Sequence, residues 1–456
     1  MKHQATTLKT AALLCSLSSM ALAGEPMAQA PAESSAAPFD FCSWLSSKPG
    51  TLYKDATNPW ISEFQISGRF HYNAAYVDGQ GADGKDWNEA YSEVRRFRLG
   101  GKISFLEYFT LKGAVNLVDD QRSNGSAVKE AQDLNWGYED VDEGTLSFNA
   151  KKAFGIEDVD GLNLIYGRFK WHGGLEARTS SNDLLTVERS ALSNKLYDSA
   201  RPTGFAVNVV KGNWNVTSGI YSSDGREPDT DLGENFNNRN NNEFLSGWHD
   251  DLMFNTEVIY TANEDLRFGW EFLYNDADKY SNHFATGNDN LLPYKWASTL
   301  SAEYTVNRFG LNSELFYGDN GNIDDHKTKG EYDRRGMFGG VVLTPYYWIV
   351  PAKLQAVVQY MYAGSEDGQG IRTNSRYFRG SKNVDNTGKA GAATAGDVNG
   401  GRGDALHTVY AGLNYLVCGD NLKFQAGVEY TNLNTPLYKE GDASAFTYLF
   451  GFRTNF

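Results

Sequence analysis

Beyond its first 23 residues, the 456-residue sequence has no long apolar segment. A membrane-spanning helix requires about 20 consecutive apolar residues. No stretch after Ala23 approaches that length. The sequence therefore excludes a helical membrane protein beyond its N-terminal segment.

Cysteine and positive charge are also scarce. Three cysteines are too few for a disulfide scaffold. The 42 lysines and arginines stand against 57 aspartates and glutamates, and the resulting net charge of −15 disfavours nucleic acid as a partner. The 7 histidines show no H-x-x-x-H spacing and no G-x-S-x-G elbow occurs, so we expect neither a cofactor nor an enzyme.

Aromatic residues and glycine, by contrast, are plentiful. The chain has 26 Tyr, 26 Phe, 10 Trp and 47 Gly against only 11 Pro. These aromatic residues are spread through polar sequence, an arrangement that suits many short strands and turns. The composition favours an all-β protein.

The first 23 residues have the features of a cleavable secretory signal. Lys2 and Lys9 precede an apolar run over 11–21, and Ala21-Leu-Ala23 follows, which is the basic, apolar and small-residue order of an export signal. We divide the chain into a signal peptide at 1–23, a linker-like periplasmic segment at 24–60 and a β-barrel at 61–456. Residues 25–38 of the second part are rich in Pro, Ala and Ser.

From Glu63 onward, apolar and polar residues alternate with the period of two that a strand requires. Phe64, Phe70 and Tyr72 share one face of the first segment, whereas Arg69 and His71 share the other. The pattern recurs in about sixteen segments, which we place near 62–77, 92–106, 108–119, 143–153, 162–171, 203–211, 213–223, 249–262, 265–277, 293–306, 308–319, 331–348, 351–364, 405–417, 421–433 and 444–456.

The connections between these segments alternate between short and long. Tight turns occur at 106–107, 211–212, 263–264 and 419–420, and long polar loops at 119–142, 224–248 and 363–404 lie between them. An outer-membrane barrel sorts its connections in this way, with short periplasmic turns and long extracellular loops. The chain also ends within an amphipathic strand, and its terminal Phe456 resembles the insertion signal of Gram-negative outer-membrane proteins. We therefore predict a transmembrane antiparallel barrel in that membrane.

The charges expected on the inner face differ between the two halves of the barrel. Among carboxylates, the early strands place Glu63 alone inward, whereas the later strands place Glu257, Glu271, Glu303, Glu314 and Glu429 inward together with several basic residues. One wall is therefore expected to be basic, and a basic wall would favour small anionic solutes. The basic residues predicted to line this anion path are Arg69, Arg96, Arg98, Lys102, Lys112, Lys151, Arg168 and Lys170.

Several stretches resemble one porin family. They are 164–171 (LIYGRFKW), 174–181 (GLEARTSS), 185–192 (LTVERSAL), 201–204 (RPTG), 93–102 (EVRRFRLGGK), 411–416 (AGLNYL) and 422–424 (LKF). Together they are similar to the phosphate-selective porin O and P family, over roughly residues 60 to 456. The resemblance implies a sixteen-stranded barrel, usually a homotrimer, whose third extracellular loop folds into the lumen and narrows it. That loop would span about 172–202.

The expected inward loop is dense in charges of both signs. Its candidate constriction residues are Arg178, Glu188, Arg189, Lys195 and Arg201. Arginine suits an anion path because its planar group offers several donors and stays charged. Two interpretations of Glu188 and Arg189 remain open: they line the pore, or they anchor the loop to the wall by ion pairing.

Cys42 and Cys418 are the two cysteines that remain after removal of the signal. The first precedes the first strand and the second lies in a tight turn near the last strands, so both are expected on the periplasmic side. Strand sixteen neighbours strand one in a closed barrel, which brings them close. A disulfide and two free thiols both remain possible.

The sequence thus predicts a porin for passive diffusion of small hydrophilic solutes, preferring anions such as phosphate. The surrounding partners would be outer-membrane lipid and lipopolysaccharide. An outer-surface adhesin or structural barrel whose long loops carry the function is the alternative, and a barrel enzyme is a third class for which no nucleophile with a nearby base can be assembled.

Overall fold

The computed structural model describes residues 39–81, 84, 86–118, 136–169, 173–197, 201–222, 252–275, 294–321, 336–366, 370–372, 377–378, 402–434 and 442–456. The chain divides into two units, Met1–Asp40 and Phe41–Phe456. Only Phe39 and Asp40 of the first unit are described, so the predicted signal peptide at 1–23 lies outside the described residues, as does Lys170. None of the described helices is long and apolar enough to cross a membrane.

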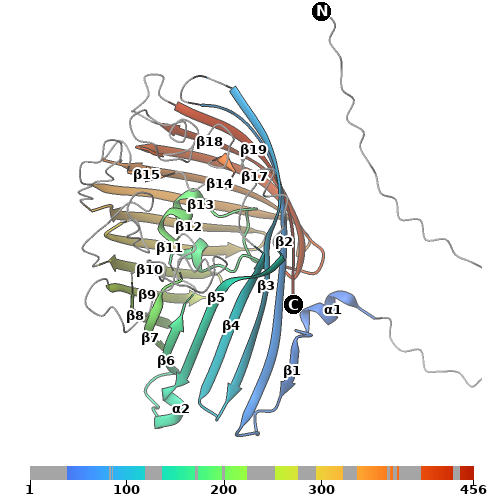
Figure 1. The fold of residues 1–456 in the computed structure, drawn as a ribbon, viewed down its shortest axis with the longest axis vertical. Coiled ribbons are helices and arrows are strands. Elements are labelled where there is room, and N and C mark those ends of the chain that lie inside the picture. Colours follow the sequence, from blue (N-terminus) through green and yellow to red (C-terminus); the bar gives the residue numbers. More distant parts are fainter. Residues whose placement is uncertain are drawn as a thin grey trace, which may run out of the picture. The chain divides into compact units, whose positions relative to one another are not determined.

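Sixteen antiparallel strands of the second unit close into a barrel (Figure 1). The strands are β2 (Ile61–Gln80), β3 (Asp86–Phe105), β4 (Phe109–Val118), β5 (Trp136–Asn149), β6 (Gly161–Arg168), β7 (Thr203–Lys211), β8 (Trp214–Ser222), β9 (Leu252–Asn263), β10 (Leu266–Asn275), β11 (Trp296–Val306), β12 (Phe309–Asp319), β13 (Met337–Val350), β14 (Leu354–Ser365), β17 (Ala405–Leu416), β18 (Leu422–Asn434) and β19 (Asp442–Asn455). Each pairs with the next along the chain, and β19 pairs with β2 to close the sheet. The predicted sixteen-stranded all-β barrel is confirmed.

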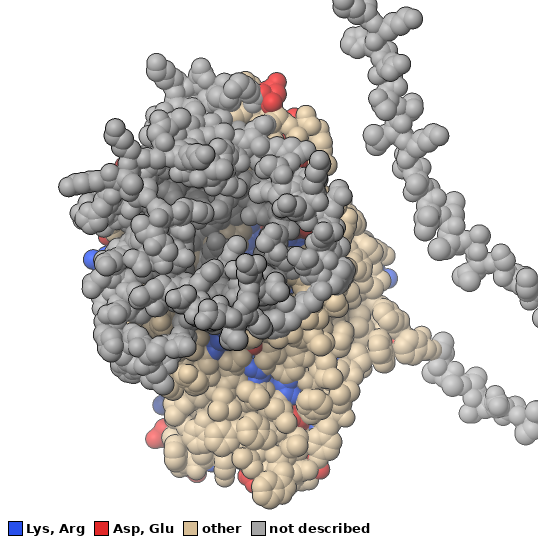
Figure 2. All heavy atoms as spheres, viewed as in Figure 1, with Lys and Arg blue, Asp and Glu red and all other residues tan. Residues whose placement is uncertain are grey.

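The two faces of the wall differ as the alternation predicted. In β19, Phe446 and Tyr448 are 49% and 50% exposed, whereas Thr447 and Arg453 between and beyond them are 2% and 0% exposed. The same rows of exposed aromatic and aliphatic side chains recur around the barrel, and the described surface in Figure 2 is largely uncharged. The outer face is therefore apolar, and the charged side chains of the wall point into the lumen.

Tight turns join the strands at one end of the barrel, which we call the turn end. Leu106, Glu107, Asn307 and Ala352 adopt positive φ there, at 48°, 63°, 53° and 57°. Two consecutive positive φ values at 106–107 match the backbone twist of the flanking strands. We call the opposite end, where the long connections lie, the loop end.

Lys151 lies outside the strand in which the sequence analysis placed it. The strand expected at 143–153 ends at Asn149, because the Asn149 side chain accepts a hydrogen bond from Lys152 N (2.9 Å) and caps the short helix α2 (Ala150–Phe154). Gly155 ends this helix at a φ of 63°. Lys151 therefore lies in a turn-end connection and donates to the Asp160 carbonyl (3.3 Å); its predicted position on the lumen wall was wrong.

The N-terminal part of the barrel unit contributes to the seam between β2 and β19. Helix α1 (Phe41–Ser46) precedes β1 (Thr51–Lys54), which pairs with residues 63–65 of β2. The β19 pairing with β2 ends at Arg69, and Ile66 N donates to the Gly50 carbonyl (2.8 Å) just beyond it. β1 therefore pairs with the part of β2 that lies beyond the end of the β19 pairing. The structure joins the sulfur atoms of Cys42 and Cys418 in a disulfide.

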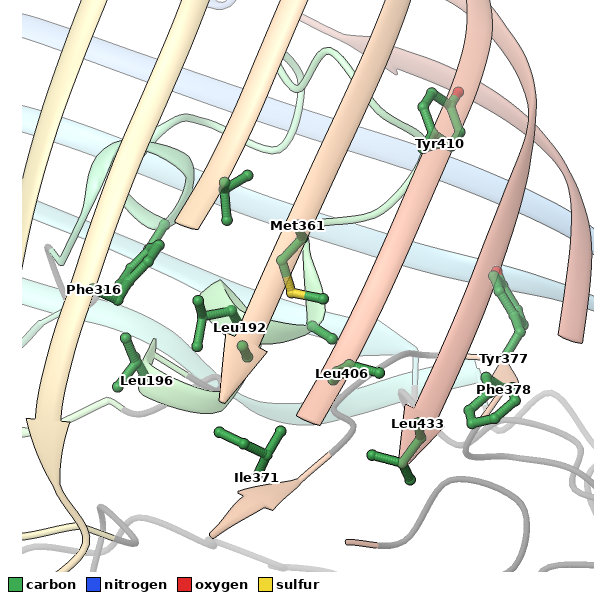
Figure 3. Packing of buried hydrophobic residues seen from close by; sticks show 14 of the residues in the cluster. Leu192, Leu196, Phe316, Met361, Ile371, Tyr377, Phe378, Leu406, Tyr410 and Leu433 are labelled. Atoms are coloured by element: carbon green, nitrogen blue, oxygen red, sulfur yellow. The ribbon is translucent and has the colours of Figure 1, made fainter. Parts of the chain in front are cut away.

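The loop-end half of the lumen contains a hydrophobic core, which the alternation did not predict. Helix α4 (Ala191–Tyr197) places Leu192 and Leu196 between Phe316 and Met361 of the wall (Figure 3). The connection between β14 and β17 adds further apolar side chains: the ring centroids of Phe378 and Trp87 lie 6.2 Å apart, and those of Tyr377 and Tyr91 5.5 Å apart. Two inward connections therefore pack against apolar wall residues in this half of the lumen.

The seam generates a first prediction. Cys42 and Cys418 should resist alkylation in the unreduced, folded protein and each should take up one alkyl group after reduction. Replacing both with Ser should lower the free energy of unfolding by about 2–4 kcal/mol. Peptide mass spectrometry after alkylation with and without reductant measures the first effect, and two modified cysteines in the unreduced protein would exclude the bridge.

Candidate functional site

Residues 173–197, which belong to the connection between β6 and β7, form what we call the inward segment. They include α3 (Leu175–Arg178) and α4, and they contact wall strands on opposite sides of the lumen. Most of this segment has no regular secondary structure, so its backbone N–H and C=O groups need other partners.

Glutamates of β10 and β12 bind the start of α3. Gly174 N donates to Glu271, and Leu175 N donates to Glu314 Oε1 (2.5 Å). The first N–H groups of a helix have no partner within the helix. These two carboxylates supply that partner and attach the inward segment to β10 and β12.

Basic and amide side chains of β17, β18 and β19 bind the carbonyls further along the segment. Arg453 donates to the carbonyls of Ser181 and Val187. Lys423 Nζ donates to the Leu184 carbonyl (3.2 Å), as does Gln425 Nε2 (3.0 Å). The segment therefore turns N–H groups toward glutamates of β10 and β12 and carbonyls toward β18 and β19.

Arg178, a predicted constriction residue, contacts glutamates of β9 and β11. Its Nη1 lies 3.7 Å from Glu257 Oε2, and its Nη2 lies 3.5 Å from Glu303 Oε1. A Cβ on Gly269 would lie 2.9 Å from Arg178 Nη1 and 2.5 Å from Ser301 Oγ. The glycine leaves the space that the guanidinium occupies against β10 and β11.

Glu188 and Arg189 hold the segment in place. Glu188 Oε1 accepts from Arg95 Nε (2.8 Å) and from Asn73 Nδ2 (2.7 Å) on the wall. Arg189 donates to the carbonyls of Glu176 (3.0 Å) and Thr179 (2.7 Å) within the segment. Glu188 thus makes the ion pair to the wall that the anchoring interpretation expects, whereas the hydrogen bonds of Arg189 join parts of the segment to one another. Of Lys195, the structure describes only the backbone, in α4.

Glu176 is buried within the inward segment itself. Its Oε2 accepts from Ser190 N (2.9 Å) and Ser190 Oγ (2.6 Å), and its Oε1 accepts from Gln359 Nε2 (3.2 Å). Burial raises the pKa of this carboxyl, and the donors from Ser190 and Gln359 oppose that rise. These bonds join the two ends of the segment to each other and to β14.

Two β-bulges each place a charged side chain on the inner face where the sequence analysis did not expect one. The β2–β3 register shifts between His71 and Tyr72, which leaves Arg95 as the extra residue of β3. The β4–β5 register shifts between Ala114 and Val115, which leaves Asp142 as the extra residue of β5. A bulge changes the parity of a strand. The shift in parity is the reason that the sequence analysis missed Arg95, whereas it missed Asp142 because it assigned residues 119–142 to a loop, and the structure places Asp142 within β5.

Three of the predicted basic residues on the wall, Arg98, Lys102 and Lys112, have acidic partners, as does the constriction residue Arg201. Arg98 Nη1 lies 2.8 Å from Asp142 Oδ2 and Arg201 Nη2 lies 2.6 Å from Asp142 Oδ1. Lys102 pairs with Glu63 (2.5 Å) and Lys112 with Glu143 (2.9 Å). Glu63 is therefore not the only inward carboxylate of the early strands, and the expectation of an unbalanced basic wall was wrong.

The remaining predicted arginines have different surroundings. Arg69 Nη1 donates to Ser181 Oγ of the inward segment (2.7 Å). Arg96 is buried in β3, with an exposed fraction of 8%, and Arg168 is the last residue of β6. Arg69 and Arg98 lie opposite each other in the β2–β3 pairing, but the burial of Arg96 means that the four arginines do not form one exposed row.

A chamber of about 800 Å³ lies between the inward segment and the wall from β6 to β13. Its charged lining combines Arg178 and Arg267 with Asp183, Glu257 and Glu303. The rest of the lining includes amide, hydroxyl, aromatic and aliphatic side chains. This chamber is the candidate functional site, because it joins polar lining to the segment that narrows the lumen.

This architecture is that of an outer-membrane channel. The structure is similar to the outer membrane channel DcaP of Acinetobacter baumannii, with a TM-score of 0.50 and 13% identity, covering 88% of this chain and 100% of that one. It is also similar to OmpT of Vibrio cholerae (TM-score 0.49, 12% identity, 89% and 99% covered) and to OprB of Pseudomonas putida (TM-score 0.49, 12% identity, 86% and 94% covered).

The sequence itself matches the family of phosphate-selective porins O and P over residues 64–288. This match confirms the family resemblance, and it includes the stretches quoted between residues 93 and 204. No curated protein matches the chain. The fold and the family together support a porin channel of the outer membrane.

The anchoring contacts generate a second prediction. Arg453→Leu should loosen the inward segment, because each hydrogen bond from a charged donor contributes about 1.5–3 kcal/mol and Arg453 bonds to more than one carbonyl. We expect noisier single-channel currents and faster proteolysis within residues 173–197. Arg308→Leu, at an exposed turn position, is the matched control and should leave both unchanged. Equal currents in the two variants would contradict the anchoring role.

Proposed function

We propose that this protein is a porin for passive diffusion of small hydrophilic solutes through the outer membrane. The single observation that carries the proposal is the polar chamber of about 800 Å³ inside a closed barrel, beside a segment that narrows the lumen. A chamber lined by charges of both signs admits polar solutes and hinders apolar ones.

The anion preference expected from the sequence is a finer proposal, and we expect it to be weak. Lys112 and Lys102 have exposed side chains, at 55% and 36%. Lys112 nevertheless pairs with Glu143, and Lys102 pairs with Glu63. A neighbouring carboxylate cancels much of the field of a cation at distances beyond the pair. Selectivity for phosphate therefore receives little support from these residues.

A homotrimer is the oligomer that the family resemblance favours. The outer wall offers one flat patch for it, where Gly101, Gly113 and Gly144 lie opposite one another on β3, β4 and β5. A Cβ on Gly113 would meet nothing closer than 3.6 Å, so the packing of the barrel itself does not require glycine there. Small side chains let a neighbouring subunit approach closely.

The trimer proposal is tested by filling this patch. Gly113→Phe should shift the purified protein from trimer to monomer, because the added ring would hold a neighbour away from β4. Light scattering in detergent measures the mass. Leu164→Phe, an enlargement at an exposed outer position of β6, is the control, and an unchanged trimer in the Gly113 variant would contradict this interface.

The channel itself is tested by planar-bilayer recording. We expect steady channels with a reversal potential close to zero under a potassium chloride gradient. Glu143→Gln should move that potential toward anion selectivity because it removes the partner of Lys112, whereas Glu107→Gln at an exposed turn should not. Absence of any conductance would favour the adhesin or structural barrel, for which the hydrophobic core of the loop-end lumen is the supporting observation.

A further inference from the structure

Three polar side chains of the chamber form a row across neighbouring strands. Arg267 of β10 lies opposite Glu303 of β11, and Glu303 lies opposite Asn312 of β12. Adjacent strands are about 4.8 Å apart, so a single small molecule can contact all three. All three line the chamber.

The charges in this row cancel. Arg267 donates through Nε (2.7 Å) and Nη2 (2.6 Å) to the same oxygen, Glu303 Oε1, and Arg178 Nη2 lies 3.5 Å from it. The Arg267 side chain is 42% exposed and that of Glu303 is 28% exposed. An anion entering the chamber would therefore meet a cation already neutralised by a carboxylate that faces the same space.

Tyr346 gives the chamber an aromatic surface beside the row. It lies opposite Gly310 of β12, and a Cβ on Gly310 would lie 2.0 Å from Tyr346 Cζ. The missing side chain leaves room for the ring to lie across the neighbouring strand. A ring in this position offers an apolar surface to a solute in the chamber.

Amides supply the remaining polar groups. Asn208 Nδ2 donates to Asn215 Oδ1 (2.7 Å) and to Thr217 Oγ1 (2.9 Å), and all three side chains line the chamber with Asn312. Amides and hydroxyls both donate and accept hydrogen bonds. They match a solute whose own groups do both, as sugar hydroxyls do.

We propose that the chamber is a binding site for uncharged polyhydroxylated solutes of mono- to disaccharide size, and that Glu303 excludes phosphate from it. Glu303 accepts from sugar hydroxyls and neutralises Arg267, and it shares the neutralisation of Arg178 with Glu257. Tyr346 contacts the apolar face of the sugar ring. This proposal rests on the proposed porin function and names its solute class.

The test uses the full mature protein in planar bilayers, with maltose and inorganic phosphate as probes. Maltose should reduce the potassium chloride conductance in a saturable way, beyond its effect on the bulk solution, and phosphate should not. Tyr346→Leu should raise the half-blocking maltose concentration by about tenfold, in line with the loss of an aromatic contact. Tyr347→Leu alters the adjacent, exposed tyrosine and should have no effect.

Glu303→Gln tests the exclusion of phosphate. Removing this carboxylate leaves Arg267 without its ion-pair partner, while Arg178 keeps Glu257, so saturable block by phosphate at Arg267 should appear. Glu264→Gln, at an exposed turn position, should remain insensitive. Phosphate block in the variant and maltose block in the wild-type protein support the proposal.

Two results would overturn it and they differ from each other. Steady channels on which maltose acts no more than on bulk conductivity, or which phosphate already blocks, would reject the sugar site and leave the porin function standing. No conductance at all would reject the channel and the site together. The wild-type maltose titration decides the proposal even where a variant does not fold.

Discussion

The lumen of this barrel is organised by bonds between charged wall side chains and the backbone of the inward segment. Carboxylates of Glu271 and Glu314 accept from N–H groups at 174–175, and Arg453 and Lys423 donate to carbonyls between 181 and 187. Bonds to charged partners are among the stronger ones that a backbone can make. These bonds favour the observed direction of the segment across the lumen, since reversing it would place carbonyls against the carboxylates of Glu271 and Glu314.

This use of charge reduces what is left for solutes. Arg98, Arg201 and Asp142 form one local group, and Lys102 and Lys112 each have a glutamate beside them. An acidic chain with many inward arginines can therefore have a lumen of nearly balanced charge. Counting inward basic residues overstates the attraction for anions when the partners are not counted with them.

The sequence was sufficient to predict all sixteen strands, because an apolar outer face and a polar inner face impose a period of two that few other structures share. It failed where that period breaks. Arg95 is an extra residue at a bulge, and Asp142, also at a bulge, was assigned to the loop that precedes the expected strand. Lys151 was misplaced because Asn149 and Gly155 cap a helix, a pattern that the sequence does contain.

The lumen was predicted less well, for a physical reason. The wall side chains bind backbone groups of residues 174–187, which lie in a largely irregular segment. The side-chain types of that segment do not indicate which wall residue each backbone group will meet. Gly269 and Gly310 show the same limit, because each is needed only for the space that Arg178 or Tyr346 occupies on a neighbouring strand. Such requirements arise from tertiary contact and have no local sequence pattern.

The β1 extension of the seam has a consequence for how the chain comes together. Pairing β2 with β19 joins segments that are separated by nearly the whole barrel sequence, and the entropy lost in closing so long a loop opposes that step. The Cys42–Cys418 disulfide covalently joins the segment before β1 to the turn between β17 and β18, so it shortens the loop that the closing pairing must close once it has formed. A bridge formed early in folding would therefore bring the last strands close to the first and restrict the search for the closing register.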